Sequence, residues 1–198
     1  VLTLSKEEKE EILKQRISIP SINDIKNNII FMTISGSYSY GLATPDSDID
    51  VRGVFIPDRE YVFGTLDIEQ IKDDNTDTVV TTLSKFVKLL IKSNPDSFSV
   101  LGTTEDDYLY ISPLYKKFLD NKNLFLTKRC TSAYIGYIQG EHKRYINRCV
   151  KVKEALDKYE SGVVTSEEIA RLETKRNKSL MNLGRIAYTG IEILEKAN

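Results

Sequence analysis

The stretch from Gly36 to Gly53 reads GSYSYGLATPDSDIDVRG, and the predicted fold is built outward from it. A hydrophobic run over 29–34 leads into it, and an apolar segment over 54–56 follows. Apolar runs bounded by Gly, Pro, Ser and Asp are typical of strands joined by a loop. We therefore predict a strand over 29–34, a loop opened by Gly36 and Ser37, and a second strand over Asp48–Ile56.

Two aspartates, Asp48 and Asp50, occupy positions i and i+2 of this second strand. Such side chains project from the same face of a strand, so we expect the two carboxylates to lie together. A hard cation with oxygen ligands, Mg²⁺ above all, relieves their repulsion. The Gly36-Ser37 turn offers N–H groups and a hydroxyl to a phosphate. The pattern favours metal-assisted phosphoryl or nucleotidyl transfer. The alternative is an Asp-rich surface turn.

A wider set of matches resembles a known family. Gly-Ser, a gap of ten residues and Asp-Ile-Asp-Val resemble the signature of polymerase-β-like nucleotidyltransferases. The fuller string resembles a bacterial and phage branch of predicted nucleotidyltransferases. Further matches to this branch lie at Asp77, Leu83-x-Lys85-Phe86-x-x-Leu89, Asn94-Pro95 and, near the end, Lys178-Ser-Leu-x-Asn182-x-x-Arg185. The resemblance covers residues 29–102 and 171–195.

The resemblance implies a two-metal site with Mg²⁺, or Mn²⁺ in its place. Asp77 is the best candidate for the third carboxylate on a neighbouring strand, with Asp67, Asp73 and Asp74 as weaker alternatives. Lys85 matches a lysine of the branch that could reach a phosphate, although a solvated helix face explains it equally well. The predicted site comprises catalytic and metal-binding Asp48, Asp50 and Asp77, and nucleotide-binding Gly36, Ser37, Lys178 and Arg185.

Two further residue-level expectations concern neighbours of the motif. We expect Arg52 to pair with a motif carboxylate rather than with substrate. The branch tends to have a glutamate after its Asn-Pro segment, whereas this chain has Ser97, Ser99 and Val100 in that neighbourhood. No role for a fourth carboxylate is therefore carried over.

The fold class predicted is α+β, with a small mixed β-sheet and flanking helices followed by an α-helical region. We expect a nucleotidyltransferase catalytic domain over 1–126 and an α-helical domain over 127–198, the latter truncated at its C-terminus. Apolar spacing and capping residues define the other elements. We expect helices over 5–15, 21–27 (capped by Ser21), 83–90, 95–101 and from 113, and strands over 66–71, 77–81 and 108–111.

The predicted C-terminal region is helical from Thr127 almost to its end. Ser161 and Gly162 interrupt it, and Thr165 caps the segment that follows. An apolar and aromatic face is expected from the helical spacing of Ala133, Tyr134, Tyr137, Ile138 and Tyr145, and then of Leu172, Leu180, Leu183, Ile186 and Ala187.

Charge is divided unevenly along the 198 residues, whose formal net charge is −1. Residues 1–126 carry 14 basic and 20 acidic side chains, a net of −6, and residues 127–198 carry 14 and 9, a net of +5. A basic half suits a triphosphate or a nucleic acid. Solvated helix faces explain the same excess equally well.

Several classes of protein do not fit this composition. No apolar run approaches a membrane span and the chain does not start with a signal peptide, so we expect a cytoplasmic protein without membrane association. The lone His142 argues against a histidine-based metal site or triad. Cys130 and Cys149 lack a C-x-x-C spacing, so we expect both to be reduced.

The predicted activity is Mg²⁺-dependent transfer of a nucleoside monophosphate from an NTP, ATP by default, to an acceptor hydroxyl. The mildly favoured acceptor is RNA, in particular a tRNA end. One alternative is AMP transfer to Tyr, Ser or Thr of a protein, as in antitoxin-like minimal nucleotidyltransferases. Another is a non-catalytic nucleotide- or RNA-binding regulatory module. The sequence does not indicate an oligomeric state.

Overall fold

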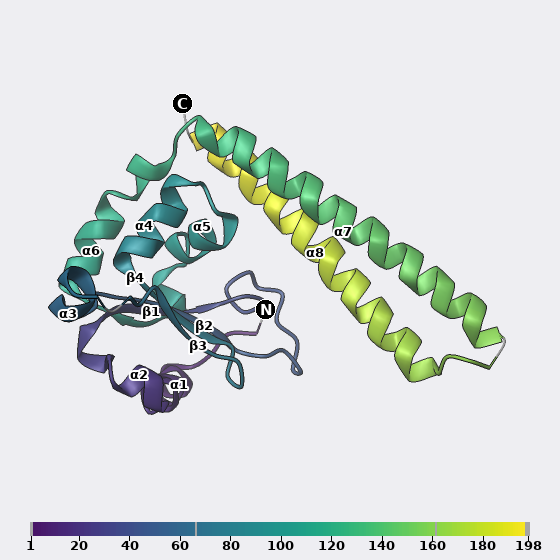
Figure 1. The fold of residues 1–198 in the computed structure, drawn as a ribbon, viewed down its shortest axis with the longest axis horizontal. Helices are drawn as coiled ribbons and strands as arrows, with labels where there is room; N and C mark the ends of the chain where they lie inside the picture. Colours follow the sequence, from purple (N-terminus) through teal and green to yellow (C-terminus); the bar gives the residue numbers. More distant parts are fainter. Residues whose placement is uncertain (1, 66, 161, 197–198) are drawn as a thin grey trace. The chain divides into compact units, whose positions relative to one another are not determined.

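A computed structural model describes residues 2–65, 67–160 and 162–196 (Figure 1). The chain divides into two compact units, residues 1–125 and 126–198. The first is built around a sheet and the second is a pair of long helices. The architecture is α+β with a small mixed sheet, flanking helices and a helical C-terminal region, as the sequence predicts.

The sheet has five strands in the order β3-β4-β2-β1-β5. The central pair β2 and β4 is parallel, and the other neighbours are antiparallel. The strand predicted over 108–111 is β5, which lies at one edge of the sheet because it pairs with β1 alone. The strands are β1 (Ile29–Ser35), β2 (Asp50–Phe55), β3 (Gln70–Asp73), β4 (Thr78–Thr82) and β5 (Tyr108–Ile111).

Strand register brings the motif residues to one end of this sheet. Ser35, the last residue of β1, pairs with Asp50, the first residue of β2. Val51 pairs with Thr78, the first residue of β4. The turn after β1, the start of β2 and the residue before β4 therefore meet at the same end of the sheet.

Helices cover both faces of the sheet (Figure 1). The face toward α1 and α2 packs a cluster that includes Ile12, Ile22 and Met32. On the other face Phe31 stacks on Tyr115, with ring centroids 4.1 Å apart. The helices of this unit are α1 (Lys6–Ile17), α2 (Pro20–Asn23), α3 (Arg59–Phe63), α4 (Leu83–Ile91), α5 (Pro95–Leu101) and α6 (Pro113–Asp120), with 3₁₀ turns η1 (Lys26–Asn28), η2 (Glu105–Asp107) and η3 (Lys122–Phe125).

Side-chain caps set where most of these helices begin. Ser5 and Glu8 form a capping box on α1. Thr82, Asn94 and Ser112 cap α4, α5 and α6 by accepting a backbone N–H. The prediction of Ser21 as a cap is wrong, because Pro20 occupies the first turn of α2 and Ile19 precedes it. A Pro at that position lacks only an N–H that the helix leaves unbonded anyway.

Three predicted strands start later than expected. β4 begins at Thr78, one residue after the predicted start at Asp77. β3 begins at Gln70, and Leu66, where the prediction began, lies outside the described residues. β2 begins at Asp50, so Asp48 is not part of a strand. The reason is that β1 ends at Ser35 and Gly36 turns away with φ +67°, which leaves Asp48 opposite no partner.

The second unit consists of α7 (Arg129–Glu160) and α8 (Ser166–Lys196), which pack along each other. Thr165 accepts the N–H of Glu168, as predicted for a cap. Tyr134 and Ile186 are buried, in agreement with the predicted face. Leu180 and Tyr137 are 48% and 40% exposed, against prediction. Ser179, next to Leu180, is buried and accepts a hydrogen bond from Arg148. Among the described residues, no helix is long and apolar enough to span a bilayer.

Candidate active site

The carboxylate of Asp50 lies directly against the glycine turn. A Cβ added to Gly36 would be 2.1 Å from Asp50 Oδ2, which no side chain tolerates. The φ of +67° at Gly36 also favours glycine. Both the space and the backbone conformation at this position therefore require a residue without a side chain, and the predicted phosphate-binding turn and carboxylate are in contact.

Arg52 ties Asp50 to the turn before β4. Its Nη2 lies 3.1 Å from Asp50 Oδ1, and its Nη1 donates to the carbonyl of Asp77 at 2.6 Å. Asp50 and Arg52 are two residues apart in a strand and so share a face. The expectation that Arg52 pairs with a motif carboxylate is confirmed.

Asp77 occupies the turn position immediately before β4. Its φ of 46° is in the left-handed region, which is uncommon for a residue other than glycine. Its carbonyl also accepts the backbone N–H of Val51 at 3.1 Å. This carbonyl is thus held by two donors from β2, while the side chain is exposed beside Asp50.

Asp48 reaches the same neighbourhood from a loop. The loop is closed by the N–H of Thr44 donating to Ser47 Oγ and the N–H of Ser47 donating to the Thr44 carbonyl, both at 2.9 Å. Asp48 follows this turn and is exposed. The expected strand alternation is therefore not what brings Asp48 toward Asp50.

Three acidic groups influence one another here. Burial raises the pKa of the Asp50 carboxyl above its ordinary value, and the Arg52 guanidinium opposes this effect. The negative charges of Asp77 and Asp48 raise the same pKa further. Two neighbouring negative charges therefore make the ionised form of Asp50 less favourable.

The Gly36-Ser37 turn resembles the first turn of a helix. The carbonyl of Gly36 accepts the N–H of Tyr40 at 3.3 Å and the hydroxyl of Ser39 at 3.1 Å. The carbonyl of Ser37 accepts the N–H of Leu42 at 2.8 Å. In such a turn the bonded N–H groups come after the first three residues, and the earlier N–H groups remain available to an anion.

The carboxylates at this site are ligands of the chemical type that binds a divalent cation. Carboxylate oxygens are the ligands that Mg²⁺ and Mn²⁺ take, and the charges of Asp48 and Asp77 both act on Asp50. Within residues 2–65, 67–160 and 162–196, however, no three His, Cys, Asp or Glu side chains are gathered as a ready set of ligands. The Asp50 carboxylate is instead engaged by Arg52.

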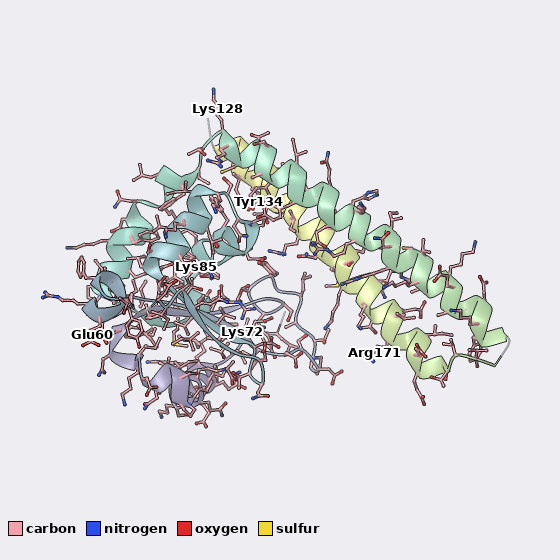
Figure 2. All side chains as sticks on the ribbon, in the orientation of Figure 1. Glu60, Lys72, Lys85, Lys128, Tyr134 and Arg171 are labelled. Carbon is pink, nitrogen blue, oxygen red and sulfur yellow. The ribbon has the colours of Figure 1, made fainter. Side chains whose placement is uncertain are left out.

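The alternative carboxylates and Lys85 are used elsewhere. Asp73 accepts the N–H and the hydroxyl of Thr76 within the β3–β4 turn. Asp74 forms an ion pair with Lys72, and Asp67 is exposed ahead of β3. Lys85 lies on α4 (Figure 2). Its Nζ lies 2.9 Å from a carboxylate oxygen of Glu69 and donates to Gln70 Oε1. These contacts explain the position of the Lys85 side chain without a role in phosphate binding.

The two predicted nucleotide-binding cations belong to the second unit. Lys178 is exposed on α8. Arg185 donates through Nε and Nη2 to Asn182 Oδ1, at 3.1 and 2.7 Å. Contact of either residue with a nucleotide stays a prediction.

Sequence reasoning missed two neighbours of the motif. Arg16 of α1 donates to the carbonyl of Ile49, between the two motif aspartates, at 3.4 Å. A pocket of about 340 Å³ also borders the motif loop at Tyr38 and the end of β1 at Ile34. Its remaining lining residues are Leu2, Thr3, Leu4, Lys9, Asp106 and Asp107. No local pattern pairs segments so far apart in the chain.

Comparison with known proteins gives the family of this chain. The chain belongs to the RNA repair pathway DNA polymerase beta family, whose model matches residues 6–197. The predicted resemblance to polymerase-β-like nucleotidyltransferases is therefore confirmed, and family membership supports nucleotidyltransferase-type activity in general.

Two relatives are themselves named as uncharacterised. An uncharacterised 38.9 kDa protein from the nrdC–mobD intergenic region of Enterobacteria phage T4 is 28% identical over 123 residues, which are 56% of this chain and 36% of that protein. The uncharacterised protein YcgL of Bacillus subtilis strain 168 is 35% identical over 94 residues, 42% of this chain and 35% of its own length. The matches thus span about a third of these curated relatives.

Proposed function

We propose that this chain transfers a nucleoside monophosphate from an NTP to an acceptor hydroxyl. The observation that carries the proposal is the contact between Gly36 and the Asp50 carboxylate. A turn suited to phosphate and a carboxylate suited to a metal are what nucleotidyl transfer requires side by side. ATP is the default donor.

In the proposed reaction the acceptor oxygen attacks the α-phosphorus of the nucleotide. The bond from that phosphorus to the bridging oxygen breaks, and pyrophosphate leaves. Backbone N–H groups of the Gly36-Ser37 turn and the Ser37 hydroxyl bind the β- and γ-phosphates. Asp77 is the proposed partner of the acceptor hydroxyl and takes its proton directly or serves as a metal ligand.

Asp48, Asp50 and Asp77 are the residues proposed to hold two Mg²⁺ ions, or Mn²⁺. When bound, such ions lower the pKa of an acceptor hydroxyl and neutralise charge on the triphosphate. Arg52 has a positioning role in this proposal, because it fixes Asp50 through Oδ1 and Asp77 through its carbonyl. Arg185 is proposed to neutralise triphosphate charge.

The acceptor we favour is an RNA end, such as that of a tRNA. The description of the family as an RNA repair pathway family supports this choice, and so does the net positive charge of residues 127–198. The second candidate is AMP transfer to a hydroxyl-bearing side chain of a protein. The exposed positions of Asp48 and Asp77 are open to either kind of acceptor.

Labelled nucleotides test the proposal. The purified chain is incubated with each α-labelled NTP and Mg²⁺ or Mn²⁺, together with total RNA or with lysate protein. We expect label on RNA from the wild type, a loss of about 100-fold or more in Asp50→Asn, and full activity in Asp46→Asn, which removes an exposed carboxylate from the same loop. Label on protein would select the second candidate. Absence of label on both acceptors, from a folded chain, would overturn the proposal.

A further inference from the structure

The positive charge of the second unit is concentrated in the middle of its two helices. Residues 142–153 of α7 and 174–191 of α8 together carry nine Lys or Arg and no Asp or Glu. The segment between them, 154–173, carries six acidic and two basic residues. Solvated helix surfaces usually intersperse both signs. Sorting of this kind indicates a surface with a binding role.

Helical spacing aligns five of these cations, together with Arg171 from the preceding turn of α8, in two stripes. Each stripe follows the i, i+4, i+7 pattern that places side chains on one face of a helix. We call them together the basic face: Arg144, Arg148 and Lys151 on α7, and Arg171, Lys175 and Lys178 on α8.

A direct contact places the two stripes side by side. Arg148 Nη1 donates to the carbonyl of Lys175 at 2.6 Å and to Ser179 Oγ at 2.5 Å. The middle residue of one stripe is therefore bonded to the middle residue of the other. Arg171 is exposed on α8 (Figure 2). Lys151 and Lys175 are exposed as well.

An ion pair between Glu141 and Arg144 involves a cation of the basic face. Glu141 is buried and pairs with Arg144, whose side chain is 60% exposed. Glu173 pairs with Arg176, which is not part of the basic face. The exposed lysines of the face keep their charge for a partner.

The dimensions of the face suit a nucleic-acid backbone. Seven residues of helix advance about 10 Å along the axis, and packed helices lie about 8–10 Å apart. One strand of a nucleic acid helix presents a phosphate about every 3.4 Å of axis, hence roughly three phosphates over this length. A single triphosphate would leave most of the six cations without a partner.

We propose that the basic face binds the phosphate backbone of the RNA acceptor. The inference rests on the proposed function for the choice of RNA over another polyanion. The face supplies affinity that is independent of base sequence, because phosphate contacts position a nucleic acid without reading it. Lys178 then serves the acceptor rather than the triphosphate, which distinguishes this inference from the role that the family resemblance implies.

A matched pair of double variants tests the basic face. Lys151→Gln/Lys175→Gln removes two exposed charges from it. Lys143→Gln/Lys153→Gln removes two exposed charges five residues to either side of Arg148, about 140° round the helix from it. The two variants change the net charge of the same unit equally. They differ in whether the lost charges face the proposed RNA.

Binding is measured without NTP or divalent ion, using a fluorescent RNA strand of mixed sequence, alone and annealed to its complement. Each lost phosphate contact lowers the slope of log K against log salt by about 0.7, so Lys151→Gln/Lys175→Gln should flatten it by about 1.4 and weaken binding roughly tenfold. The control should bind like the wild type. Equal loss in both variants, or loss in neither, would overturn the inference.

Two further readouts separate this inference from its alternatives. If the face instead binds the acidic unit of a second copy, Lys151→Gln/Lys175→Gln will change the oligomeric state and leave RNA affinity unchanged, which also overturns the inference. The labelled-NTP assay reports on the proposed function alone. Charge-dependent RNA binding with no transferred label would support the basic face and reject the nucleotidyltransferase.

Discussion

The two units position their charged groups by different physical means. In the first, Asp50 is fixed by contacts from residues distant in sequence, such as Asp77, whose carbonyl holds Arg52 beside it. In the second, periodic spacing along α7 and α8 lines up the cations, and one cross-helix contact through Arg148 joins them. The first arrangement depends on close contacts around one carboxylate, whereas the second depends on regularly spaced charges along two helices.

This difference predicts how each unit responds to change. Around Asp50 there is little free space, so one added atom disturbs several contacts at once. A row of spaced cations loses binding affinity in proportion to the number of charges removed, and dissolved salt weakens its attraction for a polyanion. The predictions below test that contrast, beginning with the largest expected effect.

Gly36→Ala should have the largest effect on transfer activity. Its Cβ would collide with Asp50 Oδ2, and φ +67° strains any residue with a side chain. We expect transfer to fall by about 100-fold or more, because misplacement of about 1 Å costs that much, and the free energy of unfolding to fall by roughly 1–3 kcal/mol. Initial rates of label transfer and urea denaturation measure the two effects.

The control is the same substitution in the second unit. A Cβ on Gly140, within α7, has no neighbour within 4 Å. Gly140→Ala should therefore stabilise the helix by roughly 0.5–1 kcal/mol and leave transfer unchanged. If Gly36→Ala were as harmless as Gly140→Ala, the contact between the turn and Asp50 would have no functional role.

Arg148→Met should give the next largest effect, this time on stability. The substitution removes the donor shared by the Lys175 carbonyl and the buried Ser179 hydroxyl but keeps an apolar stem. Losing bonds to a charged donor costs roughly 1.5–3 kcal/mol. Hydrogen exchange of the α7 and α8 amides measures the loss. Arg171→Met, which removes a guanidinium from an exposed site, should leave the exchange unchanged.

Local patterns in the sequence sufficed for most elements of the fold. The capping residues Ser5, Thr82, Asn94 and Ser112 each fix a helix start through a bond within three residues, and such bonds can be predicted from neighbours alone. The pairing of Arg52 with Asp50 follows from strand alternation in the same way.

Features that depend on tertiary register were beyond sequence reasoning. Asp48 lies outside β2 because β1 has already ended at Ser35, which no local pattern specifies. Arg16 reaches the Ile49 carbonyl from a helix 33 residues away. The apolar pattern also gave no sign that Ser179 rather than Leu180 would be buried, because the packing of the facing helix, from which Arg148 donates to Ser179, is not visible in local sequence.

Asp50 should make the stability of the protein depend on pH in a defined direction. Its pKa is raised in the folded state, chiefly by burial, so the folded protein holds this proton more tightly than the unfolded chain does. The resulting stabilisation is complete below the ordinary pKa of 3.8 and is lost as pH rises through the higher folded value. Asp50→Asn should therefore gain stability relative to the wild type as pH rises through that window.

Urea denaturation at a series of pH values measures this difference, with Asp46→Asn as the exposed control. Added Mg²⁺ sharpens the test, because an ion that binds the folded state at about 100 times its Kd stabilises it by about 2.7 kcal/mol. We expect Mg²⁺ to raise the Tm of the wild type and of Asp46→Asn but not of Asp50→Asn. An equal shift in all three would place the ion elsewhere.

The smallest expected effect comes from the cap of α8. Thr165 accepts the N–H of Glu168, and Thr165→Ala leaves that group to water at a cost of roughly 1 kcal/mol. The change should appear in the hydrogen exchange of the first α8 turn and fade toward Arg171, because capping is local. RNA affinity and its salt dependence should stay at wild-type values, since no cation of the basic face is lost. A weakened RNA complex in Thr165→Ala would mean that binding requires rigid alignment of the two stripes. The charges of the basic face would then not act additively, and the two units would no longer differ in this respect.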